Sequence, residues 1–189
     1  TLFVRDEPSY ELAVKWFTCK VKLCPDMAFY LGRQPRPIAR RAALLCLLRT
    51  DRESAVATVP AQCCVQDWLD EPADTAAKVR KKSIACLPLV GFSAIMAGGR
   101  RELYYRRLAG ARLRRGIKQL SGFRYVISDR LHVHILCTLL GIPHTVLDNS
   151  YGKVGRFHKA WTTNLESVRA SDSLAAAVAG WKAGMQVSP

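Results

Sequence analysis

Two short polar segments carry the side chains best suited to chemistry, and each directly follows a predicted strand. The first segment, residues 128–132, holds Arg130 and His132, and the second, residues 148–153, holds Lys153. Both lead into predicted helices, whose free N–H groups and dipole favour an anion at the N-terminus. The sequence therefore predicts a site for a phosphate or a carboxylate, although two well-capped turns without a ligand would have the same pattern.

The helix expected over residues 130–140 places its two histidines on different sides. At about 100° per residue, His132 falls inside the apolar arc, whereas His134 shares the opposite side with Arg130. We therefore do not expect the two imidazoles to bind one metal ion. His132 is either a core histidine or a histidine at the rim of a cleft, where an arriving phosphate favours the protonated form of a general acid. We expect His134 to be solvated or to support the groups that touch a ligand.

The elements that must position these segments alternate between strand and helix. Short apolar runs predict strands, and capped or amphipathic stretches predict helices. The predicted strands are 2–4, 21–23, 42–48, 123–127 and 143–147, and the predicted helices are 6–17, 72–82, 93–97, 130–140 and 171–181. This order indicates an α/β fold with a mainly parallel sheet, in which ligands bind beyond the carboxyl ends of the strands.

Several helix boundaries depend on capping or helix-breaking residues. We expect the double glycine at 98–99 to end the helix that begins at 93. Ser128 and Asp129 are expected to cap the helix that follows them, and Ser171 or Asp172 the last helix.

The net charge of +14 is concentrated in one segment. The chain has 29 Lys and Arg against 15 Asp and Glu among 189 residues, and residues 100–124 contain nine of the cations and one acid. Such a segment is typical of nucleic-acid binding, of contact with an anionic membrane surface, or of a solvated helix face. Nucleic acid is the weakest of the three interpretations, because no recognised motif is present and aromatic residues are few in the segment.

The composition narrows the class of protein further. Apolar residues make up 49% of the chain, which excludes a disordered protein. The longest apolar stretch, 84–98, is too short for a bilayer span of about 20 residues. Seven cysteines without a Cys-x-x-Cys pair indicate reduced thiols in a cytoplasmic protein rather than a zinc site, so we expect no metal.

A series of motifs is more specific than this alternation. Residues 129–136 (DRLHVHIL), 140–144 (LGIPH) and 146–153 (VLDNSYGK) are the clearest, and weaker motifs precede them in order at 4–9 (VRDEPS), 25–29 (PDMAF), 48–51 (LRTD) and 67–68 (DW). From residue 3 to about 161, the chain resembles the polysaccharide pyruvyltransferase family. It departs from the family at Val133, where many members carry Gly. We expect only a local packing change there, with a narrower pocket, because this position points away from the apolar arc.

The resemblance implies a GT-B-like, two-lobed architecture of Rossmann type with the active site between the lobes. Residues 1–32 would then be the end of the N-terminal lobe, 33–37 a linker, 38–165 the C-terminal lobe with the donor site, and 166–189 a C-terminal helix. The family's glycine-rich entry segment has no counterpart here, and the chain opens on what looks like the middle of a strand. We therefore expect a part of a longer protein, with little activity by itself.

The resemblance also implies transfer of the pyruvyl group of phosphoenolpyruvate to a sugar of an exopolysaccharide or cell-wall glycan precursor, as a ketal. Arg130 would clamp the donor, and His132 would bind its phosphate and supply a proton. Arg5 and Asp6 would close the site from the opposite lobe, with Asp6 as a base for the sugar hydroxyl, although a structural pair at a helix start is equally consistent with them. The remaining binding residues implied are Asn149, Ser150, Tyr151 and Lys153, with Asp26, Arg49 and Asp51 as weaker candidates.

The implied partners are phosphoenolpyruvate and a glycan or lipid-linked sugar, with no cofactor and with anionic lipid at the inner face of the cell membrane as one use of the basic segment. Two alternatives remain open at this stage. The first is a GT-B glycosyltransferase that uses a nucleotide sugar, since nucleotide diphosphates make similar demands on helix N-termini. The second is a nucleic-acid or membrane-surface binding module that acts through residues 100–124.

Overall fold

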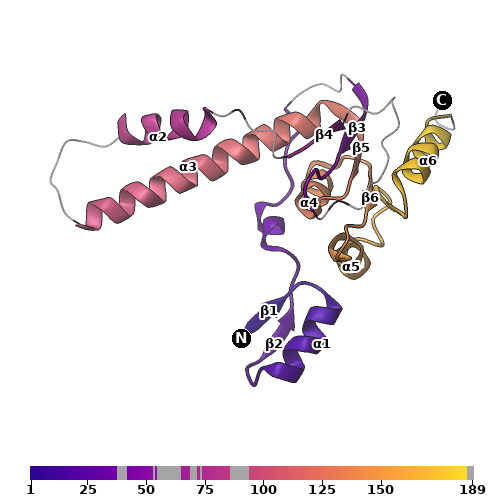
Figure 1. Cartoon of the computed structure of the whole chain (residues 1–189), viewed down its shortest axis with the longest axis horizontal. Coiled ribbons are helices and arrows are strands. Elements are labelled where there is room, and N and C mark those ends of the chain that lie inside the picture. Colours follow the sequence, from indigo (N-terminus) through magenta and orange to yellow (C-terminus); the bar gives the residue numbers. More distant parts are fainter. Residues whose placement is uncertain are drawn as a thin grey trace.

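The protein begins with a small unit that is built on two parallel strands (Figure 1). The computed structural model describes residues 1–37, 42–52, 54, 65–68, 72, 74–85 and 94–186. In the N-terminal unit, strand β1 (Leu2–Val4) pairs with strand β2 (Val21–Leu23), and helix α1 (Glu7–Trp16) connects them. Asp6 caps α1 by accepting a hydrogen bond from the Ser9 N–H at 2.9 Å. A short 3-10 helix, η1 (Met27–Leu31), follows.

The main sheet has five parallel strands in the order β4-β3-β5-β6-β7. This confirms the prediction of an α/β, Rossmann-like fold; the assignment of lobes and the domain boundaries stay predictions. The strands are β3 (Ala42–Leu47), β4 (Val65–Gln66), β5 (Phe123–Ser128), β6 (His144–Leu147) and β7 (Val168–Ser171). Their carboxyl ends lie at one edge, where the two polar segments predicted to bind an anion begin.

Helices cover both faces of this sheet, which accounts for the alternation in the sequence. On β3, Leu45 and Leu47 pack in a cluster with α3 and α4, whereas Cys46 between them packs in a cluster with α6. The helices are α2 (Thr75–Ala85), α3 (Ala94–Ser121), α4 (Leu131–Leu140), α5 (Lys153–Trp161) and α6 (Leu174–Gln186). None of the helices in the described ranges combines the length and the apolar character that a membrane crossing requires.

Two expectations about the elements are wrong. Helix α3 continues through the double glycine at 98–99, because glycine in a helix costs only about 1 kcal/mol and α2 packs along this helix (Figure 1). The last helix begins at Leu174 rather than at 171, because residues 168–171 form the edge strand β7, which was not predicted. Ser173, and not Ser171 or Asp172, caps α6 by accepting from the Ala176 N–H.

The segment expected as a linker is fastened to the main sheet and its helices. The Gln34 N–H donates to the Leu139 carbonyl at 2.9 Å, and the Arg36 guanidinium donates to the Phe123 carbonyl at 2.6 Å. Trp161 of α5 donates its indole N–H to the Arg5 carbonyl at 2.8 Å. The first two bonds fasten residues 34 and 36 at the end of α4 and at the amino end of β5, and the third fastens the N-terminal unit to α5.

Candidate active site

A cavity of about 190 Å³ lies at the carboxyl ends of β3, β5 and β6, between the first turns of α4 and α5. Among its described lining residues, the charged side chains are all basic. The residues that line it are Arg5, Arg49, Trp68, Arg130, Leu131, His132, Val133, Asn149, Lys153 and Val154. This is the edge at which a parallel sheet binds its ligands, and the lining suits an anion.

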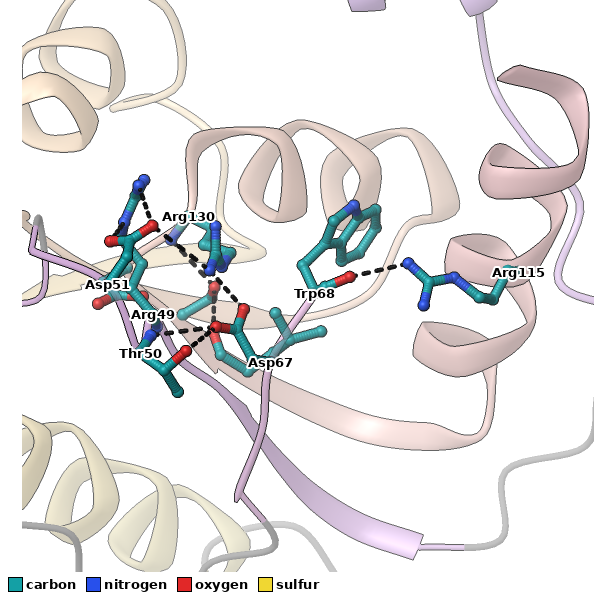
Figure 2. Close-up of polar contacts among 10 residues, drawn as sticks. Arg49, Thr50, Asp51, Asp67, Trp68, Arg115 and Arg130 are labelled. Atoms are coloured by element: carbon teal, nitrogen blue, oxygen red, sulfur yellow. Dashed lines mark hydrogen bonds and ion pairs between the residues drawn. The ribbon is translucent and has the colours of Figure 1, made fainter. Parts of the chain in front are cut away.

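Arg130 is held in this cavity by carboxylates from segments distant in the sequence (Figure 2). Its guanidinium forms an ion pair with Asp67 and lies 3.9 Å from Asp51, and only 12% of its side chain is exposed. The Asp67 side chain is 2% exposed and accepts hydrogen bonds from the N–H and the hydroxyl of Thr50. The Arg130 Nε is buried without a hydrogen-bond partner among the described residues, so a ligand in the cavity would supply one.

The turn before α4 does not cap the helix in the predicted way. Arg130 occupies the N-cap position and makes no side-chain capping bond. Ser128 instead donates to the Leu47 carbonyl and accepts from the Arg130 N–H, while Asp129 accepts from the Arg49 N–H at 2.9 Å. The helix N-terminus therefore faces the cavity without a side chain that neutralises it, which favours an anionic ligand there. Burial raises the pKa of Asp129.

Arg49 is fixed by a second carboxylate. Its guanidinium donates two hydrogen bonds to Asp51, at 2.8 and 2.7 Å, in the bidentate geometry that arginine favours. Asp51 also lies beside Arg130, so the two arginines share its charge. The sequence ranked Arg49 and Asp51 as weaker candidates; Arg49 lines the cavity, and Asp51 is the carboxylate that contacts Arg49 and Arg130 without being a lining residue.

His132 lies at the rim of the cavity, as the second interpretation of this residue predicted. Its side chain is 68% exposed, and its Nε2 lies 3.9 Å from an Asp26 oxygen that also accepts from Arg5 at 3.1 Å. The alternative of a core histidine is wrong for His132 and correct for His134, which is fully buried. Val133 does not point away from the core: it is buried and also lines the cavity.

The wrong expectations for the exposure of His132, His134 and Val133 have one physical reason. Eight of the ten residues of α4 are buried, because the sheet, α3 and α5 all pack against this helix. The angular position on a helix separates buried from exposed side chains only when one face meets solvent. For α4, exposure is instead decided by the open end of the first turn, where His132 lies.

The second polar segment is stabilised from within. Asp148 accepts hydrogen bonds from the N–H groups of Asn149, Val154 and Gly155, and Asn149 accepts from the Lys153 N–H at 2.9 Å. Gly152 precedes α5 with a φ of +70°, a conformation that favours glycine. The first N–H groups of α5 are thus occupied by side chains, so this segment contributes the Asn149 and Lys153 side chains to the cavity rather than the N–H groups of α5.

Comparison with known proteins assigns the chain to a family. The model of the family described as Polysaccharide pyruvyl transferase matches residues 1–151. The chain belongs to the polysaccharide pyruvyl transferase family. It is 34% identical to "Pyruvyl transferase 1" of Schizosaccharomyces pombe over 85% of this chain and 39% of that protein. It is 28% identical to "Putative pyruvyl transferase EpsO" of Bacillus subtilis over 89% of this chain and 52% of that protein.

The chain spans about half the length of these curated relatives, or less. A solved structure of an uncharacterized protein of Klebsiella pneumoniae has the same fold, with a TM-score of 0.54 over 90% of this chain and 54% of that one. At 19% identity, this likeness supports the fold alone.

In this member of the family, the structure brings together most of the predicted site residues. Arg5, Arg130, His132, Asn149 and Lys153 line the cavity; Ser150 and Tyr151 are not among its lining residues. Tyr151 is exposed and lies under the Lys153 ammonium, which is 5.2 Å from the centre of its ring. The roles of these residues in binding stay predictions.

Asp6 was predicted as a site residue but does not line the cavity, whereas Trp68 lines the cavity but was not predicted as a site residue. Asp6 is buried at the start of α1 as its N-cap, which favours the structural interpretation over that of a base; Arg5 pairs with Asp26 and not with Asp6. Trp68 lines the cavity although the sequence singled it out only as part of a motif. The sequence did not identify Asp67 as the partner of Arg130. The motif formed by Asp67 and Trp68 was the one signal that could have pointed to these two residues.

No cluster of metal ligands is found among the described residues. The described cysteines are free thiols, and Cys46 and Cys137 are buried.

Proposed function

We propose that this chain carries the donor site of a pyruvyl transferase, which binds phosphoenolpyruvate and transfers its pyruvyl group to a sugar as a ketal. The observation that carries the proposal is the convergence of four cations and one exposed histidine on a single cavity. These are Arg5, Arg49, Arg130, Lys153 and His132. Phosphoenolpyruvate has a phosphate and a carboxylate on the same carbon, so its site must neutralise concentrated negative charge.

Two arginines would bind the two anionic groups of phosphoenolpyruvate. Arg130, with its unpartnered Nε and the open N-terminus of α4 beside it, would hold one anionic group, and Arg49 on the neighbouring strand end would hold the other. Asp51 and Asp67 orient these two arginines before the ligand arrives. A preformed arrangement of this kind avoids the cost of ordering long side chains on binding.

His132 is placed to move the proton. In its protonated form it would give a proton to the methylene carbon of phosphoenolpyruvate, which leaves the central carbon electron-poor. A sugar hydroxyl then bonds to that carbon and returns its proton to His132. A second hydroxyl of the same sugar displaces phosphate, and its proton leaves with the phosphate, so that the products are the ketal and inorganic phosphate. General acid catalysis of this type contributes about 10²–10⁴-fold to the rate.

Binding by the chain tests the donor site directly. We expect phosphoenolpyruvate to raise the melting temperature of the protein, and a panel of nucleotide sugars to leave it unchanged. Arg130→Lys keeps the charge beside Asp67 but loses the planar fork, so it should weaken phosphoenolpyruvate binding about ten- to hundredfold. Arg124→Ala is a matched control, because this exposed arginine lies at the amino end of β5, away from the cavity.

Two results would contradict the proposal. Stabilisation by a nucleotide sugar in place of phosphoenolpyruvate would favour the glycosyltransferase alternative. Equal affinities of the wild type and Arg130→Lys would remove Arg130 from the site. In transfer assays of a full-length enzyme that contains this chain, His132→Ala is expected to retain donor binding and to lose about 10²–10⁴-fold in rate, since its exposed side chain supports no packing.

The basic segment favours neither of its binding interpretations over a solvated surface. Its exposed cations on α3 include Arg101, Arg106 and Arg114. At about 100° per residue these three point in well-separated directions around the helix, whereas the exposed Arg112 and Lys118 share a side with Arg101 and Arg114, respectively, so the charges neither form one compact stripe nor surround the helix evenly. Co-sedimentation with vesicles, with and without anionic lipid, is the measurement that tests a contact of this segment with a membrane.

A further inference from the structure

A chain of hydrogen bonds through three histidines lies behind the cavity. His134 of α4 and His144 of β6 are 0% and 2% exposed, and the His134 Nδ1 lies 2.6 Å from the His144 Nε2. The other nitrogen of His144, Nδ1, lies 2.7 Å from the Ile142 carbonyl. The other nitrogen of His134, Nε2, lies 3.0 Å from the Thr162 hydroxyl, which in turn lies 2.8 Å from the His158 Nδ1.

The direction of every hydrogen bond in this series follows from the bond to the Ile142 carbonyl. A carbonyl can only accept, so the His144 Nδ1 must carry a hydrogen and its Nε2 must accept. His134 therefore donates from Nδ1 and accepts at Nε2, where the Thr162 hydroxyl donates. The hydroxyl oxygen then accepts from the His158 Nδ1. These directions hold for neutral His134 and His144, which burial favours by lowering the pKa of His134 to about 3 and that of His144 to about 4. All three histidines then carry a hydrogen on Nδ1.

These hydrogen bonds join the two helices that carry cations of the cavity. Helix α4 presents Arg130 and His132 at its start, and α5 presents Lys153 at its start. Thr162 directly follows α5, so its bond to His134 fixes the far end of α5 against α4.

Helix α5 also holds the N-terminal unit. Trp161 donates its indole N–H to the Arg5 carbonyl at 2.8 Å. The Phe157 ring stacks on Phe29 at 6.0 Å and meets His134 edge-on at 5.9 Å. The N-terminal segment also contacts α4, because Asp26, the partner of Arg5, lies 3.9 Å from the His132 Nε2. A shift of α5 relative to α4 would therefore move Lys153 with respect to His132 and Arg5.

We infer that His134 and Thr162 are positioning residues of the donor site, which set the distance of Lys153 from His132 by fixing α5 against α4. An apolar core of equal volume would allow small rotations of the two helices, whereas a fully satisfied polar chain has one geometry. For its effect on phosphoenolpyruvate, this inference rests on the proposed function.

The test compares two adjacent threonines. Thr162→Val removes the hydroxyl that joins His158 to His134 while keeping the shape of the side chain. Thr163→Val is the matched control, because the exposed Thr163 hydroxyl bonds only the carbonyls of His158 and Lys159 in its own turn. Thr162→Ser keeps the hydroxyl and is the rescue variant.

We expect Thr162→Val to weaken phosphoenolpyruvate binding between about twofold and thirtyfold, and Thr163→Val and Thr162→Ser to leave it unchanged. In the free protein, the backbone amide NMR signals of Arg130 to Val133 should shift in Thr162→Val alone. Nitrogen-resolved NMR of the wild type should place the imidazole hydrogens of His134 and His144 on Nδ1.

The outcomes separate the two proposals. A wild type that binds no phosphoenolpyruvate contradicts the proposed function, while the amide and imidazole signals still test the positioning role. Thr162→Val could instead lower the stability of the protein and leave both the affinity and the α4 amide signals as in the wild type. The Thr162 hydroxyl would then have a structural role only, and this result would overturn the inference. A hydrogen on the His134 Nε2 would overturn the direction of the chain and the inference with it.

Discussion

Acid should destabilise this protein through the two buried histidines. In the folded state, burial lowers the pKa of His134 to about 3 and that of His144 to about 4, against an ordinary value of 6.5. The unfolded chain therefore binds protons at these two residues as the pH falls below 6.5, while the native state stays neutral. This contribution to stability is fully present above pH 6.5 and is lost as the pH falls toward 4 and 3.

The size of the effect follows from these pKa values. Between pH 7.5 and pH 5.5, each histidine is expected to lose about 1.4 kcal/mol of its contribution to the free energy of unfolding, and the pair about 3 kcal/mol. Asp129 acts in the opposite direction, because its raised pKa means that the native state holds a proton more readily than the unfolded chain. A comparison of variants is therefore needed to isolate the histidines.

Urea denaturation at pH 7.5 and 5.5, followed by circular dichroism, measures this difference. His134→Asn provides an N–H donor near the position of Nδ1 but does not titrate, so its loss between the two pH values should be smaller than that of the wild type by about 1.4 kcal/mol. Thr163→Val is the control, because this exposed substitution neither adds nor removes a titratable group. The reasoning would be refuted if the wild type and His134→Asn lost the same free energy.

Two further substitutions test the packing around the cavity. Gly116→Ala puts a methyl group 2.6 Å from the Trp68 ring and should lower the free energy of unfolding by about 1–3 kcal/mol, whereas Gly99→Ala on the same helix meets open space and should raise it by about 0.5–1 kcal/mol. Asp67→Asn leaves the buried Arg130 without its nearest countercharge and should cost about 3 kcal/mol in the same denaturation assay, and a loss below about 1 kcal/mol would show that this ion pair is not needed for stability.

The local features of the fold could be predicted from the sequence. The strand at 123–128 and the helix after it are marked by an apolar run, and Gly141 ends that helix in a left-handed conformation. Asp6 at the start of α1 is a capping residue recognisable by type and position. Each of these depends on a few neighbouring residues, because backbone hydrogen bonds and capping are short-range interactions.

The location of the site was also accessible before the structure. Parallel strands end at one edge of their sheet, so segments that follow them meet there even when they are far apart in the sequence. This is why Arg130, His132 and Lys153 could be expected in one place, and the cavity contains all three.

What only the tertiary structure decided is the set of neighbours of each side chain. No local pattern indicates that Asp67 neutralises Arg130, that Thr162 reaches His134, or that His132 is exposed and His134 buried. Helix α4 is apolar and enclosed, so the environment of each residue on it depends on which distant segment packs there. Periodicity describes one helix against one apolar layer, whereas burial, ion pairing and the pKa of a histidine are sums over all neighbours in space.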